Sequence, residues 1–327
     1  MFLKKIYSAG IFVQTFFVLV FLSLLITTES PELRISDKAL NLIPLFSELS
    51  RIGHENTIIL KIAGSLIFIV TAYLFNNLNI KHDLLPRQNT LLVVVFSTLL
   101  LANPSYSGIL LQGIVTLLLY MLLYYMYSIF NENQPYARIL TAGIIISAIS
   151  LIIPQTIVYI IFVWLGFFTY RIGNWREWVI SVIGLVVPYI YYVSWLFLTD
   201  KLNSTWFDYI TYFQSFRPVK YSLNMPEFIT LGFIALLLII NSLRFLNEAG
   251  DKVIAIRRKM WLIFHFMWVS LLVMVISGAA LVIWIPAFLL AAALFVSHNV
   301  INSRKTLTTN LLISGFLTTI LLIRLLN

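Results

Sequence analysis

The feature that most constrains this chain is a series of long apolar runs in which charged residues are almost absent. Most of these runs have the roughly 20 residues that a helix needs to cross a bilayer. The predicted segments are Gly10–Thr28, Ile58–Phe75, Thr90–Ala102, Ile109–Phe130, Ile139–Ile153, Thr156–Tyr170, Trp178–Leu198, Glu227–Phe245, Met260–Ser277, Ala279–Val296 and Leu307–Leu326. The sequence therefore predicts an all-α polytopic integral membrane protein, a single domain over residues 1–327, with about eleven transmembrane segments. No cleavage site follows the first segment, so we expect it to stay attached.

Composition supports this class and excludes others. Hydrophobic residues make up 60% of the 327 residues and charged residues only 11%, whereas soluble domains carry about 25% charged residues. This excludes a cytosolic globular enzyme, a nucleic-acid binder and a disordered scaffold. The absence of cysteine excludes disulfides and thiolate metal sites, and the four histidines show no metal-ligand spacing, so we predict neither a metal nor a cofactor.

The basic residues predict the orientation of the chain. With the N-terminus in the cytoplasm, the inner loops hold 14 of the 22 basic residues and 5 of the 13 acidic ones, a net charge of +9, and the outer side is neutral. Basic residues collect in cytoplasmic loops. We therefore expect a cytoplasmic N-terminus and a periplasmic C-terminus.

The stretch Ile139–Tyr170 is short for two complete crossings. Pro154 and Gln155 divide it, and the inner side would lose its positive excess if the stretch crossed only once. Two interpretations keep the orientation: a hairpin of two short tilted helices, or a re-entrant pair of half-helices, which would have to be buried in protein or line a cavity. The sequence leaves both open.

The first outer loop, residues 29–57, holds the candidate catalytic carboxylates Glu29 and Glu32 directly after the first segment. Leu40, Ile43, Phe46 and Leu49 then recur every three residues, a spacing that predicts an amphipathic helix on the membrane surface. The loop could be a lid over a cleft with an acid or base at its edge. The alternative is that the carboxylates only solvate the loop.

The second outer loop, residues 199–226, is rich in aromatic residues. Trp206, Asp208, Arg217 and Lys220 are candidate substrate-binding residues, because aromatic rings stack on sugars and arginine and lysine bind phosphate. The alternative is an aromatic belt that only anchors the loop at the interface.

Two features on the inner side have structural explanations. The longest inner loop, residues 244–259, contains Arg257-Arg258-Lys259, which could attract anionic lipid but which positive-inside anchoring also explains. Asn174 precedes a predicted helix and Glu177 follows three residues later, a spacing that predicts a capping box.

The run Asn174-Trp175-Arg176-Glu177-Trp178 with Pro188-Tyr189, preceded by Gly143 and Ala148–Pro154, resembles an uncharacterised family of polytopic inner-membrane proteins from Bacteroidota. The resemblance extends over about residues 79–201. It implies a Gram-negative inner membrane and a cell-envelope setting, and it implies no activity, cofactor or catalytic residue.

A weaker, architectural similarity is to membrane glycosyltransferases that use polyprenyl-phosphate sugars. These enzymes place an acidic residue, usually aspartate, in an outer loop after their first span, where this chain has Glu29. Three functions follow as hypotheses: a subunit of an envelope assembly or secretion complex, such a glycosyltransferase at the periplasmic face, or a lipid or polyprenol flippase. The expected partners are membrane lipid, polyprenyl phosphate and other envelope proteins, with no nucleic acid.

Overall fold

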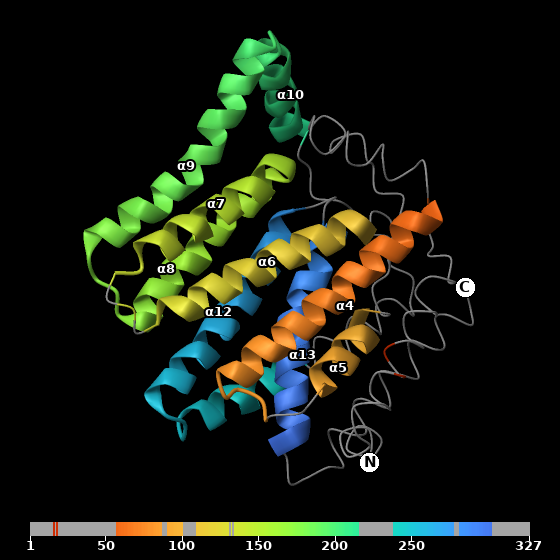
Figure 1. The fold of residues 1–327 in the computed structure, drawn as a ribbon, viewed down its shortest axis with the longest axis vertical. Coiled ribbons are helices and arrows are strands. Elements are labelled where there is room, and N and C mark those ends of the chain that lie inside the picture. Colours follow the sequence, from red (N-terminus) through yellow and green to blue (C-terminus); the bar gives the residue numbers. More distant parts are fainter. Residues whose placement is uncertain are drawn as a thin grey trace.

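A computed structural model of the chain describes residues 57–86, 90–100, 109–130, 132, 134–215, 238–277 and 281–302, together with residues 16 and 18. Every regular element in this part of the chain is a helix, as the sequence predicts (Figure 1). The elements are α4 (Thr57–Lys81), α5 (Leu91–Leu100), α6 (Ile109–Ile129), α7 (Tyr136–Ile152), the 3-10 helix η2 (Pro154–Val158), α8 (Tyr159–Tyr170), α9 (Trp175–Leu198), α10 (Leu202–Ser215), an unlabelled helix over 238–249, α12 (Ile254–Ile276) and α13 (Leu281–Asn302).

Five of the described helices are long and apolar enough to cross a membrane, which makes the chain a multi-pass helical membrane protein by length and composition. They are Ile59–Lys81, Ile109–Ile129, Trp175–Leu198, Ile254–Ile276 and Ile285–Asn302. Three predicted segments appear as shorter apolar helices, namely Leu91–Leu100, Tyr136–Ile152 and Pro154–Tyr170. Outside the described part lie residues 10–28 except 16 and 18, residues 307–326, the surface helix of the first outer loop and most of residues 227–245.

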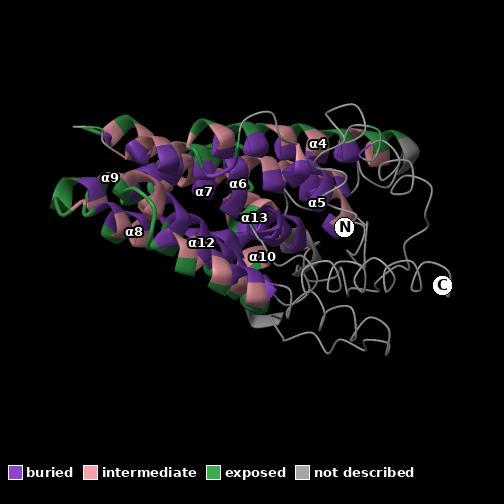
Figure 2. Ribbon diagram, turned by 90° about the horizontal axis from the view of Figure 1, so that it is seen from below, coloured by how far each residue is buried: buried purple, intermediate pink, exposed green. Residues whose placement is uncertain are grey.

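The helices differ greatly in how much of their surface other helices cover (Figure 2). In α13, 89% of the 18-residue window is buried, because α5, α6 and α12 all pack against it. Three successive alanines, Ala291, Ala292 and Ala293, are fully buried in this helix. Small side chains of this kind allow neighbouring helices to approach closely. In α9 only 17% of the window is buried, because among the described elements its main neighbour is α7.

Glycine allows two of the closest helix contacts. A Cβ atom built on Gly64 in α4 would lie 2.8 Å from the backbone of Ile109 in α6. Gly143 in α7 and Gly184 in α9 face each other, and a Cβ on Gly184 would lie 2.4 Å from the backbone oxygen of Leu140. Membrane helices associate through such small-residue contacts, because lipid provides no hydrophobic force that drives them together.

The predicted break at Pro154 is present. Ile153 has extended backbone angles (φ −136°, ψ 99°), as expected for a residue before proline, and the chain turns through η2 into α8. Gln155 and Thr156 are buried at this turn. The sequence left open whether the pair is a full hairpin or re-entrant. In the structure, Pro154, Gln155 and Thr156 at the break are buried and Ile157 is 42% exposed.

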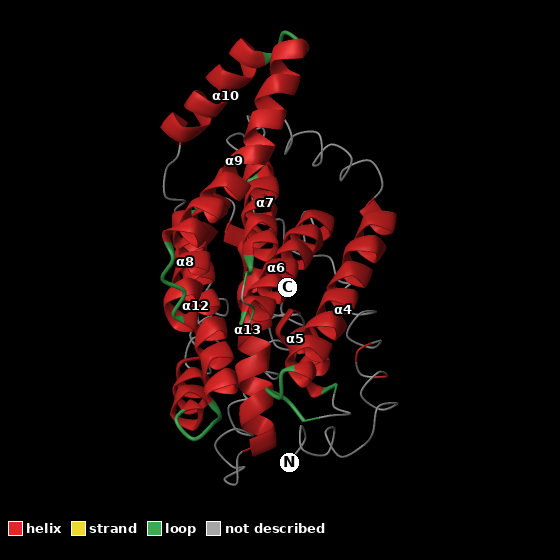
Figure 3. Ribbon diagram, turned by 60° about the vertical axis from the view of Figure 1, so that its left-hand side comes forward, coloured by secondary structure: helices red, strands yellow, loops and turns green. Residues whose placement is uncertain are grey.

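Helix α10 follows α9 through a short turn (Figures 1 and 3), and two of its tyrosines contact the break. The hydroxyl group of Tyr209 donates a hydrogen bond to the carbonyl of Leu151 (3.3 Å), and the amide of Gln155 donates to the hydroxyl of Tyr212. Burial raises the pKa of both tyrosines, so both stay neutral. Residues 202–215 belong to the predicted outer loop 199–226, and within it they form a helix whose tyrosines bond to polar groups of α7 and η2.

The predicted capping box at the start of α9 is wrong. Asn174 is the N-cap residue, but its side chain accepts no hydrogen bond from the helix backbone. Its amide instead donates to the carboxylate of Glu177 (3.2 Å). The side chain of Glu177 is buried, and its second oxygen has no hydrogen-bond partner among the described residues. Burial of the carboxylate draws the asparagine amide toward it and away from the capping position.

Candidate functional site

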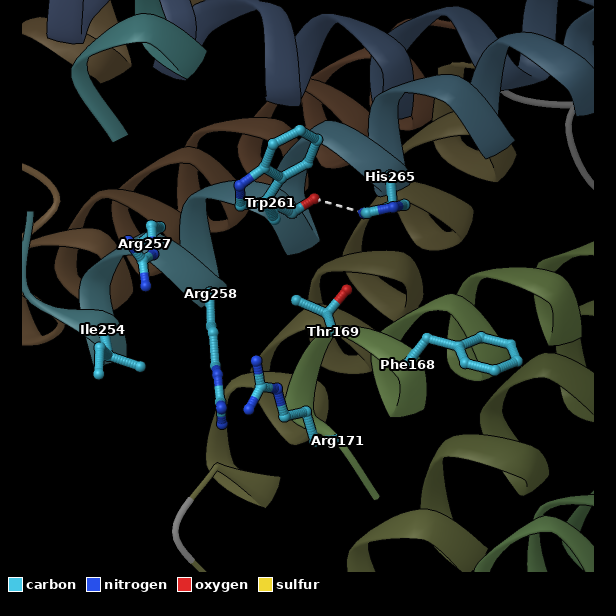
Figure 4. Close-up of a pocket in the computed structure, with 8 residues that line it drawn as sticks. All are labelled: Phe168, Thr169, Arg171, Ile254, Arg257, Arg258, Trp261 and His265. Atoms are coloured by element: carbon cyan, nitrogen blue, oxygen red, sulfur yellow. Dashed lines mark hydrogen bonds between the residues drawn. The ribbon is translucent and has the colours of Figure 1, made fainter. Parts of the chain in front are cut away.

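A cavity of about 420 Å³ lies between the end of α8 and the first turns of α12 (Figure 4). We call it the basic pocket. Its lining residues are Phe168, Thr169, Arg171, Ile254, Arg257, Arg258, Trp261 and His265. The volume falls within the range of about 300–1,000 Å³ that is typical of small-molecule sites.

Arg171 reaches the basic pocket because α8 ends in a left-handed turn. Its backbone angles are φ 60° and ψ 40°, a conformation that costs about 1–2 kcal/mol for a residue other than glycine. The backbone N–H groups of Arg171 and Ile172 donate to the carbonyls of Phe168 and Phe167 at 3.2 and 2.9 Å. These bonds close the end of the helix and place Arg171 opposite α12.

Arg257 and Arg258 come from the first turns of α12. Figure 4 shows Arg258 extending from α12 toward Arg171. Its guanidinium group donates to the backbone oxygen of Tyr170 (3.3 Å) and lies 5.6 Å from the ring centre of Phe130. A cation is favourable at the free carbonyls that end a helix and over an aromatic ring. Arg258 therefore joins α8, α6 and α12 while it lines the pocket.

The pocket carries a concentrated positive charge. Three arginines line it, and none of its described lining residues is acidic. In the part of the chain that the structure describes, no ion pair joins these arginines to a carboxylate. The ion pairs found there are Arg138–Glu132 at 2.9 Å and His298–Glu248 at 3.6 Å. Arginine stays charged at every physiological pH, so the pocket attracts an anion under all such conditions.

The apolar side of the pocket is aromatic. Phe168 and Trp261 are 69% and 40% exposed. The ring of Phe168 points away from the arginines (Figure 4) and packs against that of Trp178 on α9, with ring centres 5.4 Å apart. The Nδ1 atom of His265 donates to the backbone oxygen of Trp261 (2.7 Å). This bond fixes the imidazole against its own helix.

Next to the pocket, Lys259 joins α12 to the end of α4. Its ammonium group donates to Nδ1 of His82 (2.7 Å) and lies 5.6 Å from the ring centre of Phe130. Burial, followed by the charges of Lys259 and Lys81, lowers the pKa of His82 to about 4. His82 is therefore neutral at physiological pH and accepts this hydrogen bond, which connects the start of α12 to the end of α4.

The structure describes two of the sequence-predicted site residues, Trp206 and Asp208, and it does not bring them to the basic pocket. Trp206 and Asp208 lie on α10, where Trp206 is 65% exposed and Asp208 is partly exposed. Because α10 packs at η2 and the pocket lies at the far end of α8, about 18 Å of helix separates them. The remaining candidates, Glu29, Glu32, Arg217 and Lys220, lie outside the described residues.

The sequence gives no sign that the three pocket arginines lie close together in the fold. Arg171, Arg257 and Arg258 were all counted as inner-side charges. The contact that unites them joins residues 88 positions apart, and no motif signals it. In the described part of the chain, no group of three histidine, aspartate or glutamate side chains could hold a metal ion. The pocket's chemistry is that of anion binding.

These features define a class: a multi-pass helical membrane protein with an arginine-lined pocket at one end of its bundle. Comparison with family models, curated proteins and solved structures gives no match.

Proposed function

We propose that this chain is a lipid-handling protein of a bacterial inner membrane, a lipid or polyprenol flippase that takes up a phosphate-bearing lipid at the cytoplasmic face. The observation that carries this proposal is the convergence of three arginines in the basic pocket. Phosphate pairs with the planar guanidinium group through two parallel hydrogen bonds, and arginine is the residue best suited to this recognition.

The proposed orientation has the N-terminus in the cytoplasm, eleven segments and the C-terminus in the periplasm. It is supported by contacts between loops that the charge count assigns to the same side. Lys259 contacts His82, and Arg258 contacts Phe130 and Tyr170, so the ends of α4, α6 and α8 and the start of α12 meet at one end. The basic pocket then lies at the level of the cytoplasmic headgroups, where basic pockets between helices bind anionic lipid.

The resemblance to the Bacteroidota family adds to this proposal the setting of a Gram-negative envelope. The helix pair α7 and α8, interrupted at η2, is a second structural feature that supports a transport function. Non-helical backbone at membrane depth is tolerated where protein covers it, and in transporters such breaks border the substrate path. Here Gln155 is buried at the break and bonds to Tyr212 of α10.

The test is native mass spectrometry of the full-length protein extracted gently from its own membrane. We expect a bound lipid with a phosphate group in the wild type, and its loss in the Arg171→Gln and Arg257→Gln variants. Arg176→Gln is the matched control, because Arg176 is exposed, belongs to the same side and does not line the pocket. Arg258 is not chosen because it also holds α8. Equal lipid binding in all four proteins, or none in the wild type, would refute the proposal.

Transport is tested separately in proteoliposomes. Labelled phosphate-bearing lipid should cross the bilayer in the presence of the wild type and of Arg176→Gln, and should cross at the background rate with Arg171→Gln. Transport by Arg171→Gln at the wild-type rate would show that flippase activity does not require the basic pocket.

A second candidate is a subunit of an envelope assembly or secretion complex. The observation that favours it is α9, whose apolar surface is the least covered of the five long helices. This function predicts a partner protein that co-purifies at fixed stoichiometry and cross-links to α9.

The glycosyltransferase hypothesis depends on Glu29 and Glu32, outside the described residues. It remains a prediction that Glu29→Gln abolishes an envelope glycan modification while protein levels stay normal.

A further inference from the structure

We infer that the lipid taken by the basic pocket ends in a phosphate monoester or diphosphate, and that its apolar chain lies along an exposed stripe on α8 and α12. This inference rests on the proposed function and specifies the class of lipid. It combines the charge of the pocket with a surface that begins at the pocket and extends away from it.

The first part of the argument is charge. The three guanidinium groups have no carboxylate among the described lining residues, so the pocket favours a ligand that brings negative charge. A phosphate monoester carries about −1.5 to −2 at pH 7 and offers three oxygen acceptors. A phosphodiester lipid carries a single charge and presents a headgroup beyond its phosphate. The pocket therefore matches a terminal phosphate better than an internal one.

The second part is the stripe itself. On α12, Trp261, Trp268 and Leu272 are 40%, 51% and 40% exposed at spacings of seven and four residues, which places them on one face of the helix. Phe264 joins the two tryptophans, with ring centres 5.8 Å from Trp261 and 6.1 Å from Trp268. On α8, Phe168 and Ile161 are exposed seven residues apart.

The stripe starts at the basic pocket. Phe168 and Trp261 both line the pocket, so each helix contributes its first stripe residue to the cavity wall. The two helices pack side by side, and the hydroxyl of Tyr159 on α8 donates to Ser270 on α12 (2.9 Å). From Trp261 to Leu272 the stripe covers about 16 Å, roughly half the thickness of the hydrocarbon core.

Exposed apolar residues on a membrane helix usually contact bulk lipid. Charge complementarity is what assigns a particular occupant here, because the stripe ends at three uncompensated arginines. A chain anchored there by a terminal phosphate gains contact with aromatic rings along its length. We therefore assign the stripe to the chain of the same lipid whose phosphate occupies the pocket.

The experiment measures binding to the full-length protein in nanodiscs of phosphatidylcholine. The probes are farnesyl phosphate, farnesol, phosphatidylglycerol and inorganic phosphate. We expect farnesyl phosphate to bind at least about tenfold more tightly than each of the other three. Arg171→Gln should weaken its binding by about 10- to 100-fold, the loss expected for charge-assisted hydrogen bonds.

A second variant tests the stripe separately. Trp268→Leu should weaken the binding of farnesyl phosphate severalfold and leave the binding of inorganic phosphate unchanged. Trp175→Leu is the matched control, because Trp175 is 71% exposed and lies on α9 away from the pocket lining. A melting temperature equal to that of the wild type shows that each variant is folded.

The outcomes separate this inference from the proposed function. Equal affinity for phosphatidylglycerol and farnesyl phosphate, both lost in Arg171→Gln, would overturn the terminal-phosphate assignment and leave the proposed function standing. Inorganic phosphate binding as tightly as farnesyl phosphate would overturn the role of the stripe. Binding of no phosphate-bearing lipid, or binding that ignores Arg171→Gln, would overturn both.

Discussion

Replacing Gly184 with alanine tests the packing of α7 against α9, the contact that holds α9 to the described bundle. The added methyl group would lie 2.4 Å from the backbone oxygen of Leu140 and 3.2 Å from the Cα atom of Gly143. Ordinary van der Waals contact begins at 3.4 Å, so the two helices have to separate by about 1 Å. Neither contact is the mobile end of a side chain, so no rotamer change relieves the clash.

The magnitude follows from two opposing effects. Overpacking by one methyl group costs about 1–3 kcal/mol. Alanine in place of a helical glycine returns up to about 1 kcal/mol through its higher helix propensity. We therefore expect a net destabilisation of up to about 2 kcal/mol for Gly184→Ala, and a larger one for Gly184→Leu, whose side chain adds three further carbons to the same contact.

The assay is thermal unfolding of the detergent-purified protein, with the melting temperature of each variant compared with that of the wild type. Gly173→Ala is the matched control: it makes the same chemical change, and nothing lies within 4 Å of the added Cβ atom. We expect Gly173→Ala to melt like the wild type and both Gly184 variants to melt lower. A Gly184→Leu variant as stable as the wild type would refute the close packing of α7 and α9.

Three further predictions concern single polar contacts. Tyr212→Phe removes the hydroxyl that accepts from the buried amide of Gln155, so thermal unfolding should show a loss of about 1–3 kcal/mol, and an unchanged melting temperature would contradict this. Burial and neighbouring lysines lower the pKa of His82 to about 4 from 6.5, so the unfolded chain binds a proton at this residue more readily than the folded chain. The stabilising contribution of His82 should therefore be complete above about pH 6.5 and fall as the pH drops toward 4. The His82→Gln variant should show a flatter dependence of the melting temperature on pH. Tyr159→Phe removes a buried hydrogen bond to α12 and should cost about 0.5–1.5 kcal/mol in the same melting assay, with equal melting of variant and wild type as the refuting result.

The helix break shows which part of the fold could be predicted locally. Pro154 lacks an N–H group and pushes the residue before it out of the helical conformation, so the end of α7 follows from the sequence at that point. Helix α10, two of whose tyrosines contact the break, lies within residues 199–226, for which the sequence predicts an outer loop and no particular secondary structure. Tyr209 and Tyr212 bond to Leu151 and Gln155, which are 58 and 57 positions away in the sequence, so these contacts cannot be predicted locally.

The candidate site shows the same limit. The sequence drew attention to carboxylates and aromatic residues in the outer loops, of which Trp206 and Asp208 lie on α10. Membrane orientation explained the arginines that line the pocket, and attraction of anionic lipid was an alternative for Arg257 and Arg258. Membrane orientation depends on how many charges each loop carries, whereas a pocket depends on the direction of each charged side chain. Counting the charges in the loops does not give these directions.

The sequence by itself determined the class of this protein. Its apolar runs require helices, because a membrane offers no other partner for backbone polar groups, and each run is a local property of about 20 residues. The tertiary structure decided which faces of those helices meet. Gly143 opposite Gly184, α10 against the break, and Arg171 beside Arg258 all depend on how each helix is rotated and placed, which is set by packing between residues far apart in the chain. Hydropathy is nearly the same on every face of such helices, so it places them in the membrane without fixing their neighbours.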